Sequence, residues 1–129
     1  MPRELKKKQV ANIELYAVPP SINGFYGQHG KHKYITNKGR EFKQYVEDCL
    51  ARLVTAEAIK PFGDKRIKLT FEFHFKGKRK RDTSNYIKSL EDCLSGILFT
   101  DDEQVDEIVA KRFYHSDEYV TFIKVAEIR

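Results

Sequence analysis

KRIKLTFEFHFK, residues 65–76, carries the strongest secondary-structure signal in the chain. Apolar and polar residues alternate along most of this segment. The apolar positions are Ile67, Leu69, Phe71, Phe73 and Phe75. Because successive side chains of a strand point to opposite faces, this period of two predicts a strand with one buried face.

The residues before this strand predict a first strand and a loop. Residues 12–18 read as a strand that ends at Pro19 and Pro20, since proline donates no ladder hydrogen bond. Residues 21–33 hold three glycines and few apolar side chains, which predicts a mobile loop. A short strand at residues 34–35 would close it.

Apolar residues spaced three or four apart predict two helices. Thr36 or Asn37 would cap the first helix, which extends to about Ala56. The second helix begins near Ser84, and its apolar stripe consists of Ile87, Leu90, Leu94 and Ile97. Residues 105–115 and 119–128 predict two further strands, joined at residues 116–118.

This order of elements predicts an α+β fold, with a mixed β-sheet and two main helices on one of its faces. A chain of 129 residues fits one hydrophobic core, so we expect residues 1–129 to form a single domain. Residues 1–10 are basic, and we expect them to form a flexible N-terminal tail.

The composition indicates a folded protein with a basic surface. Lys and Arg number 24 against 19 Asp and Glu, a formal net charge of +5. This charge is compatible with a nucleic-acid partner, although a basic solvated surface explains it equally well. No apolar run has the length and flanks of a signal peptide or a membrane span, so we expect a cytoplasmic protein without a membrane partner.

Basic and acidic side chains come together after the strong strand. Four of the five residues 77–81 are Lys or Arg, and Asp82 follows them directly. Hydrolysis of a phosphodiester needs cations that hold the anionic backbone and carboxylates that hold a divalent ion. Asn85, Lys88 and Asp92 lie at i, i+3 and i+7 of the predicted helix and therefore share its polar face.

Two more aspartates, Asp101 and Asp102, follow this helix. A helix of this length separates them from Asp82 by roughly 20 Å. For Asp82 and Asp102 to meet, the chain must turn back after residue 99. A strand from Val105 that pairs beside residues 65–76 would give it a way to do so.

Each of these residues also has a simpler explanation. An aspartate at position 82 can cap the helix, and residues 101–103 are typical of a solvated turn. Lys88 and Asp92 can form a surface ion pair worth only about 0.3 kcal/mol. It is their combination that points to phosphodiester chemistry.

Two segments resemble one known family. Residues 79–105 read RKRDTSNYIKSLEDCLSGILFTDDEQV, and residues 19–26 read PPSINGFY. The first is similar to the basic run, Asp-x-Asp-Asn motif, helical lysine and late Asp-Asp of the RusA family of phage and prophage Holliday-junction endonucleases. The second resembles that family's Pro-Pro-Ser-x-Asn segment, and Gly39 stands where the family has a helix led by glycine.

The resemblance implies a role for each matched residue. Asp82 and Asp102 would be catalytic metal ligands, and Asp101 would be a further ligand that supports Asp102. Lys88 would be a catalytic or phosphate-binding lysine. Asn85 matches the asparagine of the motif.

Ser84 departs from the family pattern, because a second aspartate is common at this position. A hydroxyl is a poorer magnesium ligand than a carboxylate. Either Asp92 or Glu91 supplies the missing charge, or one ion held by two aspartates suffices. Ser84, Asn85 and Asp92 are therefore the predicted supporting residues of the site.

The resemblance further implies a Mg²⁺-dependent homodimer, with Mn²⁺ as the alternative ion. It would nick four-way DNA junctions symmetrically in recombination and repair. The predicted DNA-binding residues are Lys78, Arg79, Lys80, Arg81, Lys31 and Lys33. The rival interpretations are a non-catalytic nucleic-acid-binding module and a ribonuclease with a similar acidic site.

Overall fold

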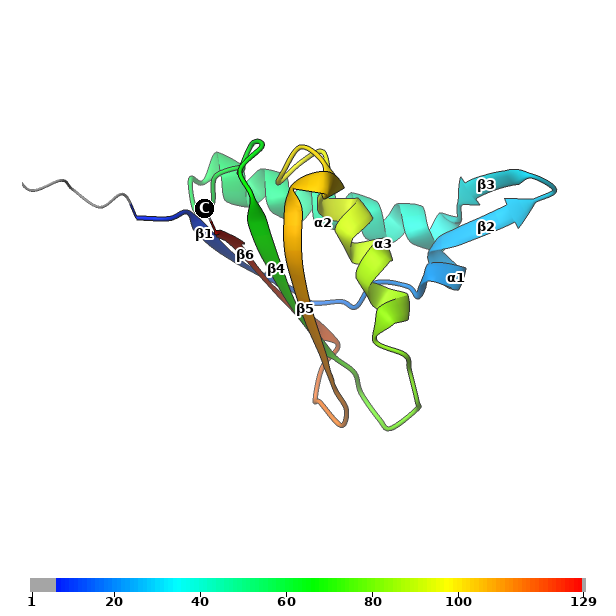
Figure 1. Ribbon diagram of the computed structural model, residues 1–129. Coiled ribbons are helices and arrows are strands. Elements are labelled where there is room, and N and C mark those ends of the chain that lie inside the picture. The colour runs from blue at the N-terminus through cyan, green and yellow to red at the C-terminus, as the bar shows by residue number, and fades with distance from the viewer. Residues whose placement is uncertain (1–6, 129) are drawn as a thin grey trace, which may run out of the picture.

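The structure is a computed structural model that describes residues 7–128. Within that range it contains a four-stranded mixed sheet, a two-stranded sheet and three α-helices (Figure 1), which confirms the α+β class. The larger sheet consists of β1 (Val10–Leu15), β4 (Ile67–His74), β5 (Val105–Phe113) and β6 (Val120–Glu127). The smaller sheet consists of β2 (Tyr26–His29) and β3 (His32–Ile35). The helices are α1 (Ile22–Phe25), α2 (Asn37–Thr55) and α3 (Ser84–Leu94), with a 3-10 helix η1 (Asp102–Gln104).

The larger sheet has the strand order β1-β6-β4-β5. The strongly alternating segment is its central strand β4, which pairs with β5 in parallel and with β6 in the antiparallel sense. Strands β5 and β6 follow each other in the sequence as predicted, but β4 lies between them. They therefore form no hairpin.

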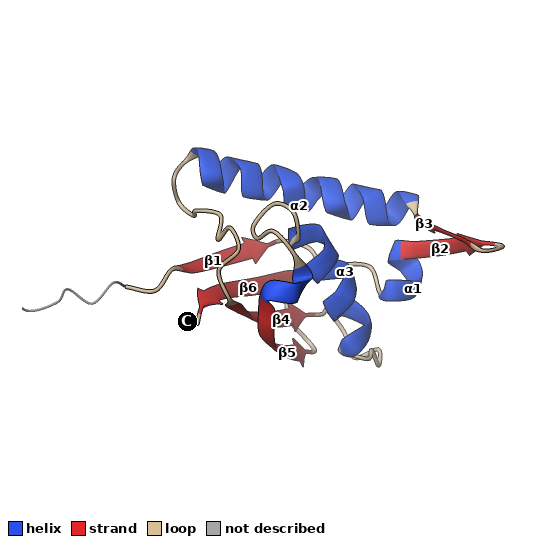
Figure 2. Ribbon diagram, turned by 45° about the horizontal axis from the view of Figure 1, so that its top comes forward, coloured by secondary structure: helices blue, strands red, loops and turns tan. Residues whose placement is uncertain are grey.

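One face of this sheet is covered by α2 and α3 (Figure 2). Every second residue of β4 is buried, from Ile67 to Phe73, and the residues between them are half-buried. Phe42, Val46 and Leu50 of α2 are also buried in this core. Full burial of such a side chain stabilises the fold by about 1.5–3 kcal/mol, which is why the apolar stripes determine where the helices pack.

The start of α2 is fixed by two local contacts. The Thr36 side chain caps the helix, since its Oγ1 accepts a hydrogen bond of 3.0 Å from the backbone N–H of Gly39. At Gly39 the helix approaches the preceding chain so closely that a Cβ would lie 2.6 Å from the carbonyl oxygen of Phe25. Glycine at this position therefore lets α1 pack against α2.

The prediction of a mobile loop at residues 21–33 is wrong. This stretch contains α1 and a β-hairpin, β2–β3, that projects from the body of the protein (Figure 1). Gly30 has a φ of +62°, the conformation that a two-residue hairpin turn requires and that glycine adopts without strain. Only Tyr26 and Ile35, at the base of the hairpin, pack against the core, and residues 28–34 are exposed. The hairpin therefore lacks the apolar alternation that identifies a strand.

The predicted N-terminal tail, residues 1–10, lies mainly outside the described residues. Within them, Val10 already belongs to β1, which begins two residues earlier than predicted and ends at Leu15. The Gln9 side chain donates hydrogen bonds to the carbonyl oxygens of Lys60 and Pro61, at 2.8 and 3.1 Å. No helix in residues 7–128 has the length and apolarity needed to cross a lipid bilayer.

Helix α3 is the crossover between the parallel strands β4 and β5. Asp82 precedes α3 on the side where β4 ends, and Asp102 follows it on the side where β5 begins. Because β4 and β5 run in the same direction, α3 runs back between these ends. The two aspartates therefore lie toward opposite ends of α3.

Candidate active site

Lys88, near the middle of α3, bridges two carboxylates. Its Nζ lies 2.8 Å from Asp92 Oδ1 and 3.2 Å from Asp102 Oδ2. The hydrogen bond to Asp92, and after it the one to Asp102, raise the pKa of Lys88 above its usual value. The ammonium is thus protonated at neutral pH, and Lys88 carries a positive charge in this cluster. Its side chain is 53% exposed, so a ligand can reach it.

Asp102 is held in place by the turn around it. The Gln104 side chain is buried and accepts hydrogen bonds of 2.9 Å from the backbone N–H groups of Thr100 and Asp101. The Asp101 carboxylate caps η1, accepting from the N–H of Glu103 at 3.4 Å. Asp101 therefore has a structural role here, whereas Asp102 points toward α3.

Asp102 has one oxygen without a partner. Its Oδ1 is shielded from solvent and accepts no hydrogen bond from the described residues 7–128. A buried acceptor left in this state costs about 1–3 kcal/mol, and more when it is charged. Such an oxygen marks a place where a cation or a hydrogen-bond donor would bind favourably.

Glu91 adds a third carboxylate to this cluster. It is buried on α3, and burial, followed by the charge of Asp102, raises its pKa above the usual range. Asp92 and Asp102 thus contact the ammonium of Lys88, and Glu91 lies near enough for the charges of Asp102 and Lys88 to shift its pKa. The cluster has an excess of acidic groups, which favours a further cation.

Tyr26, at the base of the projecting hairpin, contacts the cluster through Asp92. Its hydroxyl donates a hydrogen bond to Asp92 Oδ2, and burial and this bond raise its pKa. Lys33 of β3 lies over the Tyr26 ring, with its Nζ 4.3 Å from the ring centroid. Sequence reasoning missed Tyr26, because no spacing rule connects residue 26 to residue 92.

Asp82 is exposed and lies apart from this cluster. Its backbone carbonyl accepts from the Asn85 N–H at 3.0 Å, and no hydrogen bond or ion pair of its carboxylate is seen within residues 7–128. The N-cap of α3 is Thr83, and it makes no side-chain capping bond. The capping explanation for Asp82 therefore finds no support. Ser84 is exposed as well.

The predicted metal ligands are not gathered into one group. Across residues 7–128, no three His, Cys, Asp or Glu side chains come together in a way that could hold a metal ion. Asp92 and Asp102, however, both face one cation, and Asp102 has an unpartnered oxygen. Hard oxygen donors of this kind fit Mg²⁺. The pair Asp92 and Asp102 therefore fits a divalent ion better than Asp101 does.

The basic segment, residues 78–81, leads from β4 to α3. Lys78, Arg79 and Lys80 are exposed and form no ion pair with a carboxylate of the described chain. The Arg81 guanidinium packs 4.4 Å from the centroid of the Phe75 ring. It also donates a hydrogen bond of 3.2 Å to the carbonyl oxygen of Arg79. Lys78, Arg79 and Lys80 are thus the side chains of this segment that are free to bind phosphate. Lys31 and Lys33 are likewise exposed, on the projecting hairpin.

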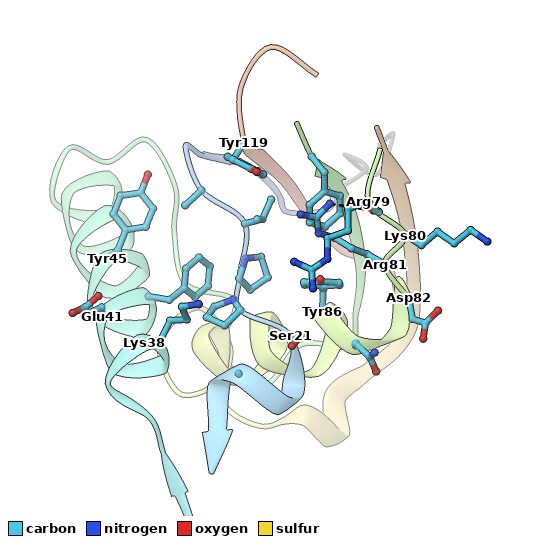
Figure 3. A pocket seen from close by; sticks show the side chains of 18 residues that line it. Ser21, Lys38, Glu41, Tyr45, Arg79, Lys80, Arg81, Asp82, Tyr86 and Tyr119 are labelled. Carbon is cyan, nitrogen blue, oxygen red and sulfur yellow. Dashed lines mark hydrogen bonds between the residues drawn. The ribbon is translucent and has the colours of Figure 1, made fainter. Parts of the chain in front are cut away.

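A hollow of about 930 Å³ opens beside the basic segment, between α2, residues 17–24 and the start of α3 (Figure 3). Asn85 lines this hollow, but Lys88 and Asp92 do not. The sequence had predicted that all three share one face of the helix. In Figure 3 the side chains of Lys80 and Asp82 point away from the hollow, and Arg81 points into it.

Comparison with known proteins gives the class to which this site belongs. A family model described as "Endodeoxyribonuclease RusA" matches residues 16–126. The "Crossover junction endodeoxyribonuclease rusA" of Enterobacteria phage HK97 is 31% identical over 91 residues, which cover 70% of this chain and 72% of that protein. The class is thus that of the endodeoxyribonucleases. The chain belongs to the RusA family, as the segments at residues 19–26 and 79–105 predicted.

Proposed function

We propose that this protein is a Mg²⁺-dependent, structure-selective endodeoxyribonuclease that resolves four-way DNA junctions in recombination and repair. Its membership of the RusA family and the crossover-junction activity named for the phage HK97 relative support this proposal. The observation that carries the choice of site is Lys88, held between Asp92 and Asp102 beside an unpartnered carboxylate oxygen.

In this proposal, each group of the cluster has a separate task. Lys88 remains protonated and holds a non-bridging oxygen of the scissile phosphate, which stabilises negative charge that develops on it. Asp92 and Asp102 orient Lys88 and hold the divalent ion. The ion, when bound, would polarise the phosphate and lower the pKa of a water molecule. Asp82 remains a predicted catalytic ligand, and its carboxylate is exposed, with no hydrogen bond or ion pair within residues 7–128.

The DNA backbone would bind to the exposed cations on both sides of the cluster. Residues 78–81 precede α3 at one end. On the other side, the hairpin that carries Lys31 and Lys33 contacts the cluster through Tyr26 and Asp92. Contacts of Lys and Arg to phosphate position the DNA without reading its sequence. The enzyme would therefore recognise the shape of a junction by where these cations lie.

We also propose that the chain acts as a single-domain unit in a homodimer, in the cytoplasm. A four-way junction is nearly two-fold symmetric, and a two-fold dimer presents two equivalent sites to it. Two such sites would make paired, symmetric nicks. Light scattering of the protein alone, and the symmetry of the cut positions, test this arrangement.

A non-catalytic junction-binding module is the second candidate. It is favoured by the separation of Asp82 from Asp102 and by the absence of a three-ligand acidic group in residues 7–128. In that case the basic segment binds DNA, and the carboxylates merely hold Lys88.

Incubation of the protein with a labelled four-way junction, with Mg²⁺, with Mn²⁺ and with EDTA, separates the two candidates. The nuclease proposal predicts paired nicks near the branch point that require the metal ion. A binding module predicts a shifted band and intact strands under all three conditions. A matched linear duplex and a structured RNA serve as controls, and preferential cutting of the RNA would contradict a deoxyribonuclease.

A further inference from the structure

The hollow beside the basic segment has two facing walls. One wall comes from α2 and includes Tyr45, and the opposite wall includes Arg81 and Tyr86 (Figure 3). Tyr86 packs against Phe75, which also lines the hollow, at a ring-centroid distance of 5.2 Å. Both walls thus present rings or a planar guanidinium, and their positions are fixed by packing.

The hollow also carries positive charge. Lys38 of α2 and Arg79 and Arg81 of the basic segment line it, and they form no ion pair with a carboxylate of residues 7–128. The acidic groups at its edge, Glu41 and Asp82, point away from it in Figure 3. An occupant with one planar ring and at least one negative charge would complement this surface.

The size of the hollow limits which occupants it can hold. A volume of about 930 Å³ is that of a small-molecule pocket and is too small for a DNA duplex. It can hold a single nucleotide. Aromatic rings bind unpaired bases by stacking, which tolerates any base because every base has a π-face.

We propose that the hollow receives one unpaired nucleotide of branched DNA, with its base between the α2 wall and the Arg81–Tyr86 wall and its phosphate on the cations. The inference rests on the proposed function, because a branch point supplies nucleotides that are easily taken out of the stack. A fully paired duplex has no nucleotide to place there. The hollow thereby selects branched DNA over linear DNA.

Photo-crosslinking locates the occupant directly. Four-way junctions carry 5-iodouracil either at the branch point or deep within one arm, and are irradiated with the protein in EDTA. The proposal predicts crosslinks from the branch-point position to peptides that contain Tyr45, Tyr86 or Tyr119, and none from the paired arm. Crosslinks elsewhere, no crosslink at all, or equal crosslinking from the paired arm would overturn it. Efficient labelling of the hollow by free 5-iodo-dUMP would also overturn it, because the hollow would then be a mononucleotide site.

Two variants test what the hollow contributes to selectivity. Tyr45→Leu removes a ring of the α2 wall, and Tyr119→Ala removes a ring at the edge whose residue is 39% exposed. Phe122→Ala is the matched control, since it removes a ring that is 40% exposed but does not line this hollow.

The measured quantity is the ratio of duplex Kd to branched-DNA Kd, by fluorescence anisotropy in EDTA. At least one of the two tyrosine variants should lower this ratio by about tenfold with duplex affinity unchanged. The control should leave the ratio as it is. Thermal unfolding checks that each variant is folded, and if Tyr45→Leu is not, Tyr119→Ala decides. An unchanged ratio in the folded tyrosine variants contradicts the proposal.

The nucleotide site and the nuclease assignment can be contradicted separately. If junctions receive paired nicks while the crosslinks map outside the hollow, the inference about the hollow falls and the enzyme stands. If no junction is cut while the crosslinks map to the hollow, the nuclease proposal falls and the nucleotide site stands.

Discussion

Lys88 holds its charge because two carboxylates face it and a third lies close by. The pKa of Lys88 is raised by Asp92 and Asp102, and that of Glu91 is raised by burial and by Asp102. The same cluster thus makes one group more basic and another less acidic. The stability of a Glu91 variant, measured at different pH values, tests the effect on Glu91.

Glu91→Gln should stabilise the protein at pH 8. The raised pKa of Glu91 means that the fold favours its protonated form, so its ionisation costs stability as the pH rises through that pKa. The Tm difference between Glu91→Gln and the wild type should be positive at pH 8. It should shrink as the pH falls toward 4.5, the ordinary glutamate pKa. Differential scanning calorimetry in EDTA measures it, and a variant that is less stable at pH 8 would contradict the assignment.

Single residues differ in how far they could be predicted from the sequence. The pairing of Lys88 with Asp92 follows from helix periodicity, and the structure confirms it. The contact of Lys88 with Asp102 depends on the turn formed by η1, and that of Tyr26 with Asp92 depends on how the hairpin packs. Neither follows from spacing along the chain, since both join distant segments.

At the level of elements, α2 is the support on which the hairpin and the hollow are built. The sequence predicted Thr36 or Asn37 as its cap, and the structure has Thr36. The cap and the helical spacing of its apolar residues were predictable because both are local signals. The hairpin was not, because its strands lack apolar alternation. The close approach at Gly39 joins these elements, and it gives a direct test of their packing.

Gly39→Ala should destabilise the protein. Its Cβ would lie 2.6 Å from the Phe25 carbonyl oxygen, so α1 must shift away from α2. Strain of this kind costs about 1–3 kcal/mol, although alanine alone would favour the helix. Urea unfolding measures the change, with Ala51→Gly, at an exposed position of α2, as the control of about 1 kcal/mol for helix propensity. A Gly39→Ala variant as stable as the wild type would show that the helices are not packed this tightly.

Over the whole molecule, the parallel pairing of β4 with β5 decides which acidic residues meet. The sequence indicated that a strand from Val105 could pair beside residues 65–76, and it does. Its direction could not be inferred from the pattern. Parallel pairing brings Asp102 to Lys88 and leaves Asp82 toward the opposite end of α3, beside the basic segment. The candidate site is therefore built on Asp92 and Asp102 within one chain.

Lys80→Ala should weaken junction binding and reduce its salt dependence. Lys80 is exposed and forms no ion pair in the described chain, so a phosphate contact is its main available interaction. Loss of one such contact should reduce the slope of log K against log salt by about 0.9. Binding titrations at several salt concentrations test this, with Lys60→Ala, beyond the C-terminus of α2, as the control. Equal slopes for both variants would remove the basic segment from the DNA interface.

The most direct test of the candidate site is single-turnover cleavage of a four-way junction by Asp92→Asn. The substitution keeps the shape of the side chain but removes the charge that holds Lys88, so the cleavage rate should fall at least about 100-fold while junction binding and the Tm are retained. Asp48→Asn, which changes an exposed aspartate of α2 whose one side-chain partner within residues 7–128 is Gln44, should cut within about twofold of the wild-type rate. Wild-type cleavage by a folded Asp92→Asn variant would show that the cluster around Lys88 is not the active site.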